Sequence, residues 1–378
     1  MKILVIPTTD WTRHPVPNRL NFIFDILAER NEVFVLHFGI GQFSKNIPRE
    51  TCCTLINSGP IPAKDPSLFY LLNAPFHLAS LIRTVHREEI DVIVSANILP
   101  SFLASLGSTP VVFDYLDHLE ESASVYYPGS LLGRVIRCGV KAITSFNLKQ
   151  STSIITVSSD FSKYLADAGL TRVTVIPNGV DTATLSPLPT AEAKQKLGLD
   201  GPVLGYVGSL EYWVDLESVI SALPSLDVTL LVVGPGLFTD YGTQIQRLAD
   251  DCGVSDRVIF TGLVPFSDLG LYISAMDIGL NPLKKMAKNE MTVGGKVFNY
   301  LACGKPVLSS RMAALEHMLG DALFYYDDVP SFVSQAASIL AAPGDPSRYR
   351  DIALHYDWRH LAARYEKVLV SASGRTVP

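Results

Sequence analysis

A short glycine-rich turn before a helix is the part of this sequence best suited to bind an anionic ligand. Gly294 and Gly295 stand directly ahead of a run with helical spacing, and Lys296 begins that run. Glycine has no Cβ, so the backbone of such a turn can approach phosphate oxygens closely. The free N–H groups and the dipole at the start of a helix attract anions, and Lys296 adds a formal charge. These residue types predict a phosphate-binding turn, and the alternative is an ordinary tight turn with a solvated lysine.

Polar side chains also follow a buried strand in the first half of the chain. Asp114, Asp117 and His118 come directly after the apolar run 111–113. Doubly wound sheets place ligands at the carboxyl ends of their strands, and a carboxylate or a histidine there can take a proton from a hydroxyl. Asp117 and His118 are therefore expected to hold or deprotonate a substrate hydroxyl. Asp114 is either part of that site or a structural carboxylate that caps a neighbouring backbone.

The loop after the first strand is expected to lie at the same edge of that sheet. It contains Trp11, Arg13 and His14, and Arg19 follows at the beginning of the next helix. These residues would suit an anionic substrate, such as a lipid phosphate or an acidic sugar. The alternative is a surface loop with scattered charges.

Short apolar runs alternate with longer runs at helical spacing, which predicts parallel strands joined by crossover helices. The pattern restarts at residues 203–207, after a stretch with Pro and Gly at 182–201 that we interpret as an interdomain connection. A chain of 378 residues is long enough for two domains. The predicted fold class is α/β, with two Rossmann-like doubly wound domains facing across a ligand cleft.

Four motifs occur in order between residues 175 and 308. They are VIPNGVD at 175–181, VLGYVGSL at 203–210, VIFTGLVP at 258–265 and GGKVFNYLACGKPVL at 294–308. Together they resemble the retaining glycosyltransferases of the GT-B fold, in the family called glycosyltransferase family 4 or group 1. The resemblance is good from about residue 155 to residue 310 and loose over the first 150 residues.

The resemblance implies an acceptor-binding domain over residues 1–180 and a donor-binding domain over residues 181–356. A last helix, 357–378, is expected to pack back on the first domain, with Trp358 as a packing anchor. The implied reaction transfers a sugar with retention, from a UDP- or GDP-sugar, to a hydroxyl of a lipid-linked or glycan acceptor. Two alternatives stay open: a nucleotide-sugar epimerase of the same fold, and an inactive glycosyltransferase-like subunit.

The family pattern assigns roles to residues of this sequence. Donor contacts are expected from Gly208, Ser209, Val264, Phe266, Lys284, Gly294, Gly295, Lys296 and Asn299. Val264 and Phe266 would lie at the nucleobase. Acceptor contacts are expected from Trp11, Arg13, His14, Arg19 and Asp117, and catalytic roles from Asp117, His118, Glu290 and Lys296.

Two positions depart from that pattern. Asn299 stands where a glutamate usually holds the ribose hydroxyls, and Ser209 stands where an arginine usually contacts the phosphates. The missing cations are expected to come from Lys284, Lys285 or Lys288. Glu290 is expected at the sugar or on backbone N–H groups of its loop, and the alternative is an exposed loop carboxylate.

Composition limits the remaining choices. The net charge of −6 argues against a nucleic-acid partner, and five irregularly spaced cysteines favour a reducing, cytoplasmic compartment. No metal is expected, because the sequence has no Asp-x-Asp pair of the kind that chelates a metal–diphosphate. No cofactor is expected either, since the nucleotide-sugar is the substrate. Residues 122–159 contain no Asp or Glu, but they contain four cations and many apolar residues. The helix expected at 130–149 is therefore a candidate for peripheral contact with the cytoplasmic face of a membrane, or else a core helix.

Overall fold

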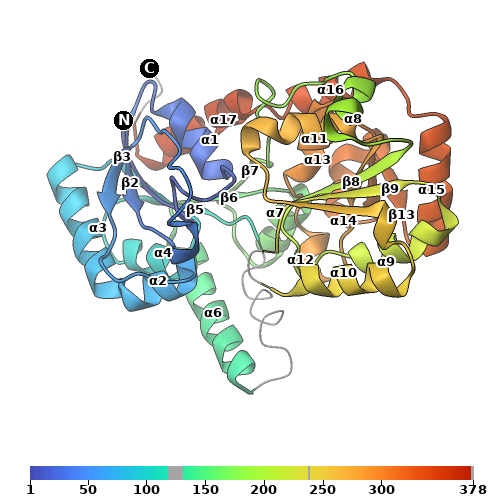
Figure 1. Ribbon diagram of the computed structural model, residues 1–378. Helices are drawn as coiled ribbons and strands as arrows, with labels where there is room; N and C mark the ends of the chain where they lie inside the picture. The colour runs from blue at the N-terminus through green and yellow to red at the C-terminus, as the bar shows by residue number, and fades with distance from the viewer. Residues whose placement is uncertain (118–130, 237–238, 376–378) are drawn as a thin grey trace. The chain divides into compact units, whose positions relative to one another are not determined.

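The computed structural model describes residues 1–117, 131–236 and 239–375 and divides into two compact units. Unit 1 contains Met1–Pro177 and Trp358–Pro378, and unit 2 contains Asn178–Asp357. Each unit is built on one parallel sheet with helices packed against it (Figure 1). The predicted α/β class with two Rossmann-like domains is confirmed.

Unit 1 has seven strands in the order β3-β2-β1-β4-β5-β6-β7. The strands are β1 Lys2–Ile6, β2 Glu32–His37, β3 Thr54–Asn57, β4 Val92–Ser95, β5 Val111–Asp114, β6 Ser153–Thr156 and β7 Val173–Val175. The α-helices are α1 Arg19–Leu27, α2 Pro66–Leu72, α3 Ala74–Glu88, α4 Ile98–Ala104, α6 Leu131–Gln150, α7 Ser159–Asp167 and α17 Trp358–Ala372. The order reverses beside β1, as in doubly wound folds.

Local sequence explains where two of these helices begin. The side chain of Asn18 accepts hydrogen bonds from the backbone N–H groups of Leu20 and Asn21 and so caps α1. Asn73 ends α2 and precedes α3, and Pro75 lies in the first turn of α3. Proline lacks an N–H group, so it fits the first turn of a new helix rather than the interior of a longer one.

A buried ion pair connects distant parts of unit 1. The Nε atom of Arg19 lies 3.0 Å from Oδ2 of Asp114, and both side chains are almost fully buried. Nη1 of Arg19 also donates to the carbonyl oxygen of Pro177 at 2.7 Å. The hydroxyl of Tyr365, on α17, donates to the same carboxylate oxygen at 3.2 Å. The C-terminal helix therefore belongs to the core of unit 1, where Trp358 is also buried.

Unit 2 has six strands in the order β10-β9-β8-β11-β12-β13. The strands are β8 Val203–Val207, β9 Thr229–Val233, β10 Val258–Gly262, β11 Ile278–Asn281, β12 Val307–Ser310 and β13 Phe324–Tyr326. The α-helices are α8 Thr190–Leu197, α9 Leu216–Ala222, α10 Tyr241–Asp251, α11 Leu269–Ala275, α12 Ala287–Glu290, α13 Lys296–Ala302, α14 Ala313–Leu319, α15 Val329–Ala341 and α16 Pro346–Leu354.

The stretch 182–201, which the sequence suggested as an interdomain connection, is part of unit 2. It contains α8, and Leu185 and Ala193 are buried in the core of that unit. Nζ of Lys194 lies 2.6 Å from Oδ2 of Asp277. That interpretation was wrong, because prolines and glycines at 182–201 bound a short packed helix rather than a solvated linker.

Among the described residues, no helix is both long and apolar enough to cross a membrane.

Replacing Arg19 by Met should lower the free energy of unfolding by about 3–5 kcal/mol, because it leaves the Asp114 carboxylate buried without its cation. The matched control is Arg30→Met, which breaks the pair of Arg30 and Glu366 at 2.8 Å, where the Arg30 side chain is 56% exposed. The control should lose less than about 1 kcal/mol. Urea denaturation followed by circular dichroism measures both, and equal losses would contradict the structural role of Arg19.

Candidate functional site

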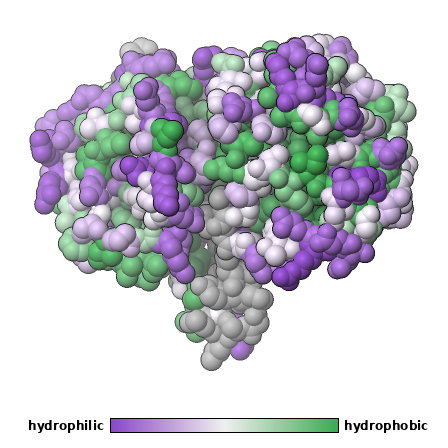
Figure 2. Space-filling model, viewed as in Figure 1, coloured by the Kyte–Doolittle hydropathy of each residue, from purple (hydrophilic) through white to green (hydrophobic). Residues whose placement is uncertain are grey.

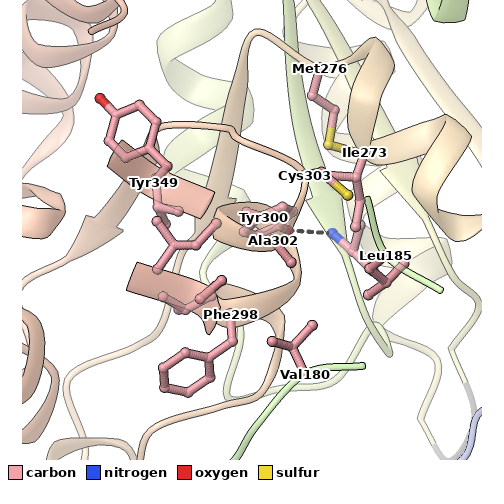
Figure 3. Packing of buried hydrophobic residues seen from close by; sticks show 14 of the residues in the cluster. Val180, Leu185, Ile273, Met276, Phe298, Tyr300, Ala302, Cys303 and Tyr349 are labelled. Carbon is pink, nitrogen blue, oxygen red and sulfur yellow. Dashed lines mark hydrogen bonds between the residues drawn. The ribbon is translucent and has the colours of Figure 1, made fainter. Parts of the chain in front are cut away.

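Helix α13 is fixed against the sheet of unit 2 by its tyrosine. The hydroxyl of Tyr300 donates to the carbonyl oxygen of Leu280 at 3.0 Å and accepts the N–H of Val207 at 2.7 Å. A Cβ atom at Gly279 would lie 2.4 Å from the Tyr300 ring, so only glycine allows this approach. Figure 3 shows Tyr300 among the buried residues of α13 and its neighbours. The start of α13 is thereby held near the carboxyl end of β8.

Lys296, the first residue of α13, points to that strand end. Its Nζ atom lies 3.2 Å from the hydroxyl oxygen of Tyr206 and 4.2 Å from the centre of the Tyr206 ring. It is also close to Gly208, because a Cβ atom built there would lie 3.5 Å from Nζ. Burial away from water lowers the pKa of Lys296 to about 7. The amine is therefore poised between its charged and neutral forms near neutral pH.

Three neighbouring strands of unit 2 each end at or just before a glycine with positive φ: Gly208, Gly234 and Gly262. The N–H of Gly208 donates to the carbonyl of Val233, and the N–H of Gly234 donates to that of Gly262, both at 2.9 Å. A Cβ atom at Gly234 would lie 2.3 Å from the carbonyl oxygen of Gly208. The strand ends are therefore packed backbone against backbone, at the edge where doubly wound sheets bind ligands.

The glycine turn before α13 is open on its outer side. Gly294 is exposed, and a Cβ atom there would meet nothing within 4 Å. Gly295 is the N-cap of α13, with no side-chain cap. The side-chain amide of Asn178 donates to the carbonyl of Val293 at 2.8 Å and anchors the turn. Asn299 is half-buried one turn further on, and its carboxamide has no hydrogen bond within the described part of the chain.

The sequence analysis missed a carboxylate beside this site. Glu211 is fully buried, and its Oε1 accepts a hydrogen bond from the hydroxyl of Ser209 at 2.7 Å. The hydroxyl of Tyr206 donates to the backbone carbonyl of Ser209, also at 2.7 Å. Lys296, Tyr206, Ser209 and Glu211 thus form one polar chain. Glutamate is usually exposed, so nothing in the sequence marked Glu211 as buried.

The lysines expected to replace the missing cations are engaged elsewhere. Nζ of Lys284 lies 2.7 Å from Oε1 of Glu217, and Nζ of Lys285 lies 3.5 Å from Oδ1 of Asp327. Lys288 lies over the ring of Trp213, with Nζ 4.0 Å from its centre. The charge of Lys284 is thus already paired with a carboxylate, and its donor contact stays a prediction.

Glu290, expected at the sugar or on its own loop, caps another helix instead. Its Oε2 atom accepts the backbone N–H of Ala313, the first residue of α14, at 3.1 Å. A carboxylate is favourable at a helix N-terminus, so this contact accounts for Glu290 without a substrate.

The two residues predicted at the nucleobase differ in their surroundings. Val264 is buried within the hydrophobic core of unit 2, whereas Phe266 is only partly buried and packs against that core. An apolar residue after a strand can complete the core as readily as a pocket, and the nucleobase contact of Val264 stays a prediction. Phe266 keeps an accessible part.

In unit 1 the side chains of the loop predicted to contact an acceptor form hydrogen bonds within the protein. Trp11 is 1% exposed, and its Nε1 donates to the hydroxyl of Thr51 at 3.1 Å. Nη1 of Arg13 donates to the carbonyl of Ser44 at 2.7 Å. Nδ1 of His14 lies 2.7 Å from the carbonyl of Val16, and burial lowers the pKa of His14. Trp11 is thus a core residue, and the predicted acceptor contact does not fit its burial.

The two aspartates predicted at the end of β5, Asp114 and Asp117, also have different surroundings. Asp114 is the fully buried partner of Arg19, and burial raises its pKa against the opposing effect of the arginine. Arg19 was therefore wrongly expected at an anionic substrate, because its guanidinium is buried in this pair. Asp117 is half-buried at the end of the described segment, and His118 lies outside the described residues.

The structure of unit 2 thus brings together Gly208, Ser209 and Lys296 at the end of β8, with Gly294 and Gly295 just ahead of Lys296. No group of three or more metal-binding side chains occurs in the ranges that the structure describes.

Comparison with known proteins adds two family matches. Residues 201–342 match the model described as glycosyl transferases group 1, and residues 27–184 match glycosyltransferase family 4. Between them the two models cover most of both units.

Individual relatives agree with these matches. TuaH of Bacillus subtilis, assigned to teichuronic acid biosynthesis as a glycosyltransferase, is 30% identical over 235 residues, which is 58% of each chain. A GDP-mannose-dependent α-(1-6)-phosphatidylinositol monomannoside mannosyltransferase of Mycolicibacterium smegmatis is 29% identical, over 53% of this chain and 56% of its own length. The matches thus span little more than half the length of these curated relatives.

The fold has a solved counterpart. Anabaena HepE in complex with UDP-glucose superposes with a TM-score of 0.73 at 20% identity, covering 98% of this chain and 100% of that one.

The Lys296 amine is expected to titrate near pH 7, far below the ordinary lysine value of about 10.4. NMR titration of ¹³C-methylated lysines would detect it, and the resonance that titrates near pH 7 should be missing from Lys296→Arg protein. The resonance of Lys305, whose pKa burial lowers to about 8, should remain in that variant. If every resonance that titrates below about pH 9 persists in Lys296→Arg protein, the buried setting of Lys296 is contradicted.

Proposed function

Because the chain belongs to the group 1, family 4 glycosyltransferases of the GT-B fold, we propose that it transfers a sugar from a nucleotide-sugar to an acceptor hydroxyl. The observation that carries the proposal is the position of Lys296 beside Gly208 at the carboxyl end of β8. This strand edge is where doubly wound sheets bind nucleotides.

The donor diphosphate is placed along the backbone of Gly208 and the open turn of Gly294 and Gly295, with Lys296 as its cation. A fixed positive charge and backbone N–H groups there would stabilise the charge that develops on the leaving diphosphate. We propose that Phe266 and Asn299 contact the nucleoside. The donor is a UDP- or GDP-sugar, which the UDP-glucose bound to HepE and the GDP-mannose-dependent relative support.

Transfer is proposed to retain the configuration at the sugar and to need no metal. Lys296 and the backbone groups supply the electrostatic stabilisation that a metal ion would otherwise give. The acceptor hydroxyl would then attack from the face that the diphosphate leaves. Asp117 and His118 remain the proposed acceptor-side groups, together with Arg13 and His14 of the loop after β1.

The acceptor is proposed to be lipid-linked or a glycan, with peripheral membrane contact through residues 130–149. The phosphatidylinositol-linked acceptor of the mycobacterial relative supports a lipid-linked substrate. An epimerase is not favoured, because the reported relatives are named as transferases.

A thermal-shift series with UDP, GDP, ADP and CMP tests the donor site. One diphosphate should raise the melting temperature, since a ligand at about 100 times its Kd stabilises the native state by about 2.7 kcal/mol. Lys296→Ala should abolish the shift, whereas Lys196→Ala should keep it, because Lys196 is exposed on α8 and paired with Glu192. Equal shifts in both variants would remove Lys296 from the site.

Affinity for the nucleotide-sugar should fall as the pH rises above about 7, by up to tenfold per unit. Below the lowered pKa of Lys296 the amine is already charged, whereas above it binding must take up a proton. Isothermal titration calorimetry at several pH values measures the effect. Lys296→Arg, whose charge is permanent, should bind with little pH dependence. A wild-type profile as flat as that of the arginine variant would contradict the role.

A further inference from the structure

One buried hydroxyl joins helix α13 to the loop after β8. Tyr206 lies in β8 and is 1% exposed. Its hydroxyl donates to the carbonyl oxygen of Ser209 at 2.7 Å, and Nζ of Lys296 lies 3.2 Å from the hydroxyl oxygen of Tyr206. A phenol has a single proton to donate, and that proton is directed to the carbonyl. The Lys296 amine is therefore the donor in the second hydrogen bond.

The ring of Tyr206 contacts the same amine. Nζ of Lys296 lies 4.2 Å from the centre of the ring, a distance at which a cation is attracted to an aromatic face. Within the ranges that the structure describes, Nζ has no ion pair and no hydrogen-bond partner besides Tyr206. Because a lysine side chain is long and flexible, its amine would occupy several positions without such a partner. Tyr206 thus fixes the amine through two contacts.

The side chain of Tyr206 itself has little room to move. Figure 2 shows hydrophilic side chains in several places on the surface of unit 2, whereas Tyr206 belongs to the hydrophobic core beneath that surface. Its strand is paired on both sides, with Val232 of β9 and Leu280 of β11 opposite Tyr206. A Cβ atom at Gly208 would lie only 3.1 Å from the tyrosine hydroxyl. The hydroxyl is therefore held rigidly by the sheet.

Ser209, the second partner of this hydroxyl, is fixed as well. Its carbonyl oxygen accepts from Tyr206, and its own hydroxyl donates to Oε1 of Glu211 at 2.7 Å. The backbone N–H of Ser209 has no acceptor in the part of the chain that the structure describes. This N–H and the Lys296 amine are thus two hydrogen-bond donors that one phenol holds beside Gly208.

We propose that Tyr206 is a positioning residue for the donor diphosphate, because its hydroxyl holds the Lys296 amine and the backbone of Ser209 in the arrangement that the phosphates bind. The inference rests on the proposed function, which places the diphosphate at Lys296 and Gly208. Binding groups are most effective when the contacts behind them fix their geometry before the ligand arrives. Tyr206 is too deeply buried to contact the ligand and acts through the two groups that it holds.

The hydroxyl of Tyr206 also favours the charged form of the amine. Burial raises the pKa of Tyr206 well above its ordinary value, with smaller contributions from Tyr300 and Glu211, so the phenol stays neutral near neutral pH. A hydrogen bond from the Lys296 ammonium to the phenol oxygen stabilises the charge and opposes the effect of burial. Without the hydroxyl, the pKa of Lys296 should fall further below about 7.

Tyr206→Phe tests the proposal, because it removes the hydroxyl and keeps the ring. The Lys296 resonance, identified by its absence from Lys296→Arg protein, should titrate at a lower pH in this variant than in the wild type. Calorimetric titration at pH 7 uses UDP or GDP, whichever stabilises the wild type, and should show the affinity reduced at least about fivefold. The decline of affinity with pH should also begin at a lower pH, because the amine loses its proton earlier.

The matched control is Tyr349→Phe. Tyr349 is also buried in unit 2, and its hydroxyl likewise donates to a backbone carbonyl, that of Pro343, at 2.8 Å. Both variants lose such a bond, so their melting temperatures should fall by similar amounts, which also shows that Tyr206→Phe is folded. Tyr349→Phe should leave the titration of Lys296 and the nucleotide affinity as in the wild type.

A purely structural role of Tyr206 in the core predicts a different result. The proposal is overturned if Tyr206→Phe leaves either the Lys296 titration or the nucleotide affinity unchanged, or if Tyr349→Phe alters them equally. Failure of the proposed function is distinguishable, because wild-type protein would then bind none of UDP, GDP, ADP and CMP. The titration of Lys296 needs no nucleotide, so it would still show whether Tyr206 holds the amine.

Discussion

The buried pair of Arg19 and Asp114 is the interaction on which the architecture of unit 1 depends. Removing two charges from water is expensive, and the loss is offset only when geometry and further hydrogen bonds are good. Here the additional bonds come from the carbonyl of Pro177 and the hydroxyl of Tyr365. The ion pair is satisfied only when the first helix, the fifth strand, the chain after the seventh strand and the C-terminal helix are all in place.

This requirement explains why unit 1 is made from two separate stretches of chain. Trp358 and Tyr365 enter the same core as the first strand and the first helix, although more than 300 residues separate them from those elements. A conformation without the C-terminal helix would expose that apolar surface and remove one hydrogen bond from the buried carboxylate.

The candidate site of unit 2 is formed mainly by backbone groups rather than by charged side chains. Glycines at the ends of three adjacent strands allow their loops to pack closely, and Lys296 is the cation that approaches them. The buried Glu211 accepts a hydrogen bond from the hydroxyl of Ser209 beside this site. A diphosphate at this edge would thus depend strongly on the charge state of one lysine, which the buried environment sets near its midpoint at neutral pH.

The alternation of short apolar runs with longer runs at helical spacing predicted the two doubly wound sheets. Such a pattern has few other ways to bury its apolar surfaces. The motif order likewise identified the family, and the glycine turn with Lys296 was visible as a local pattern. What the sequence left undecided was which polar residues pair with each other. Arg19 and Asp114, or Lys284 and Glu217, are far apart in the chain and meet only after folding. Only the tertiary structure decided which charged side chains pair within the protein and which remain accessible to a ligand. The reason is that pairing and burial depend on contacts between distant segments.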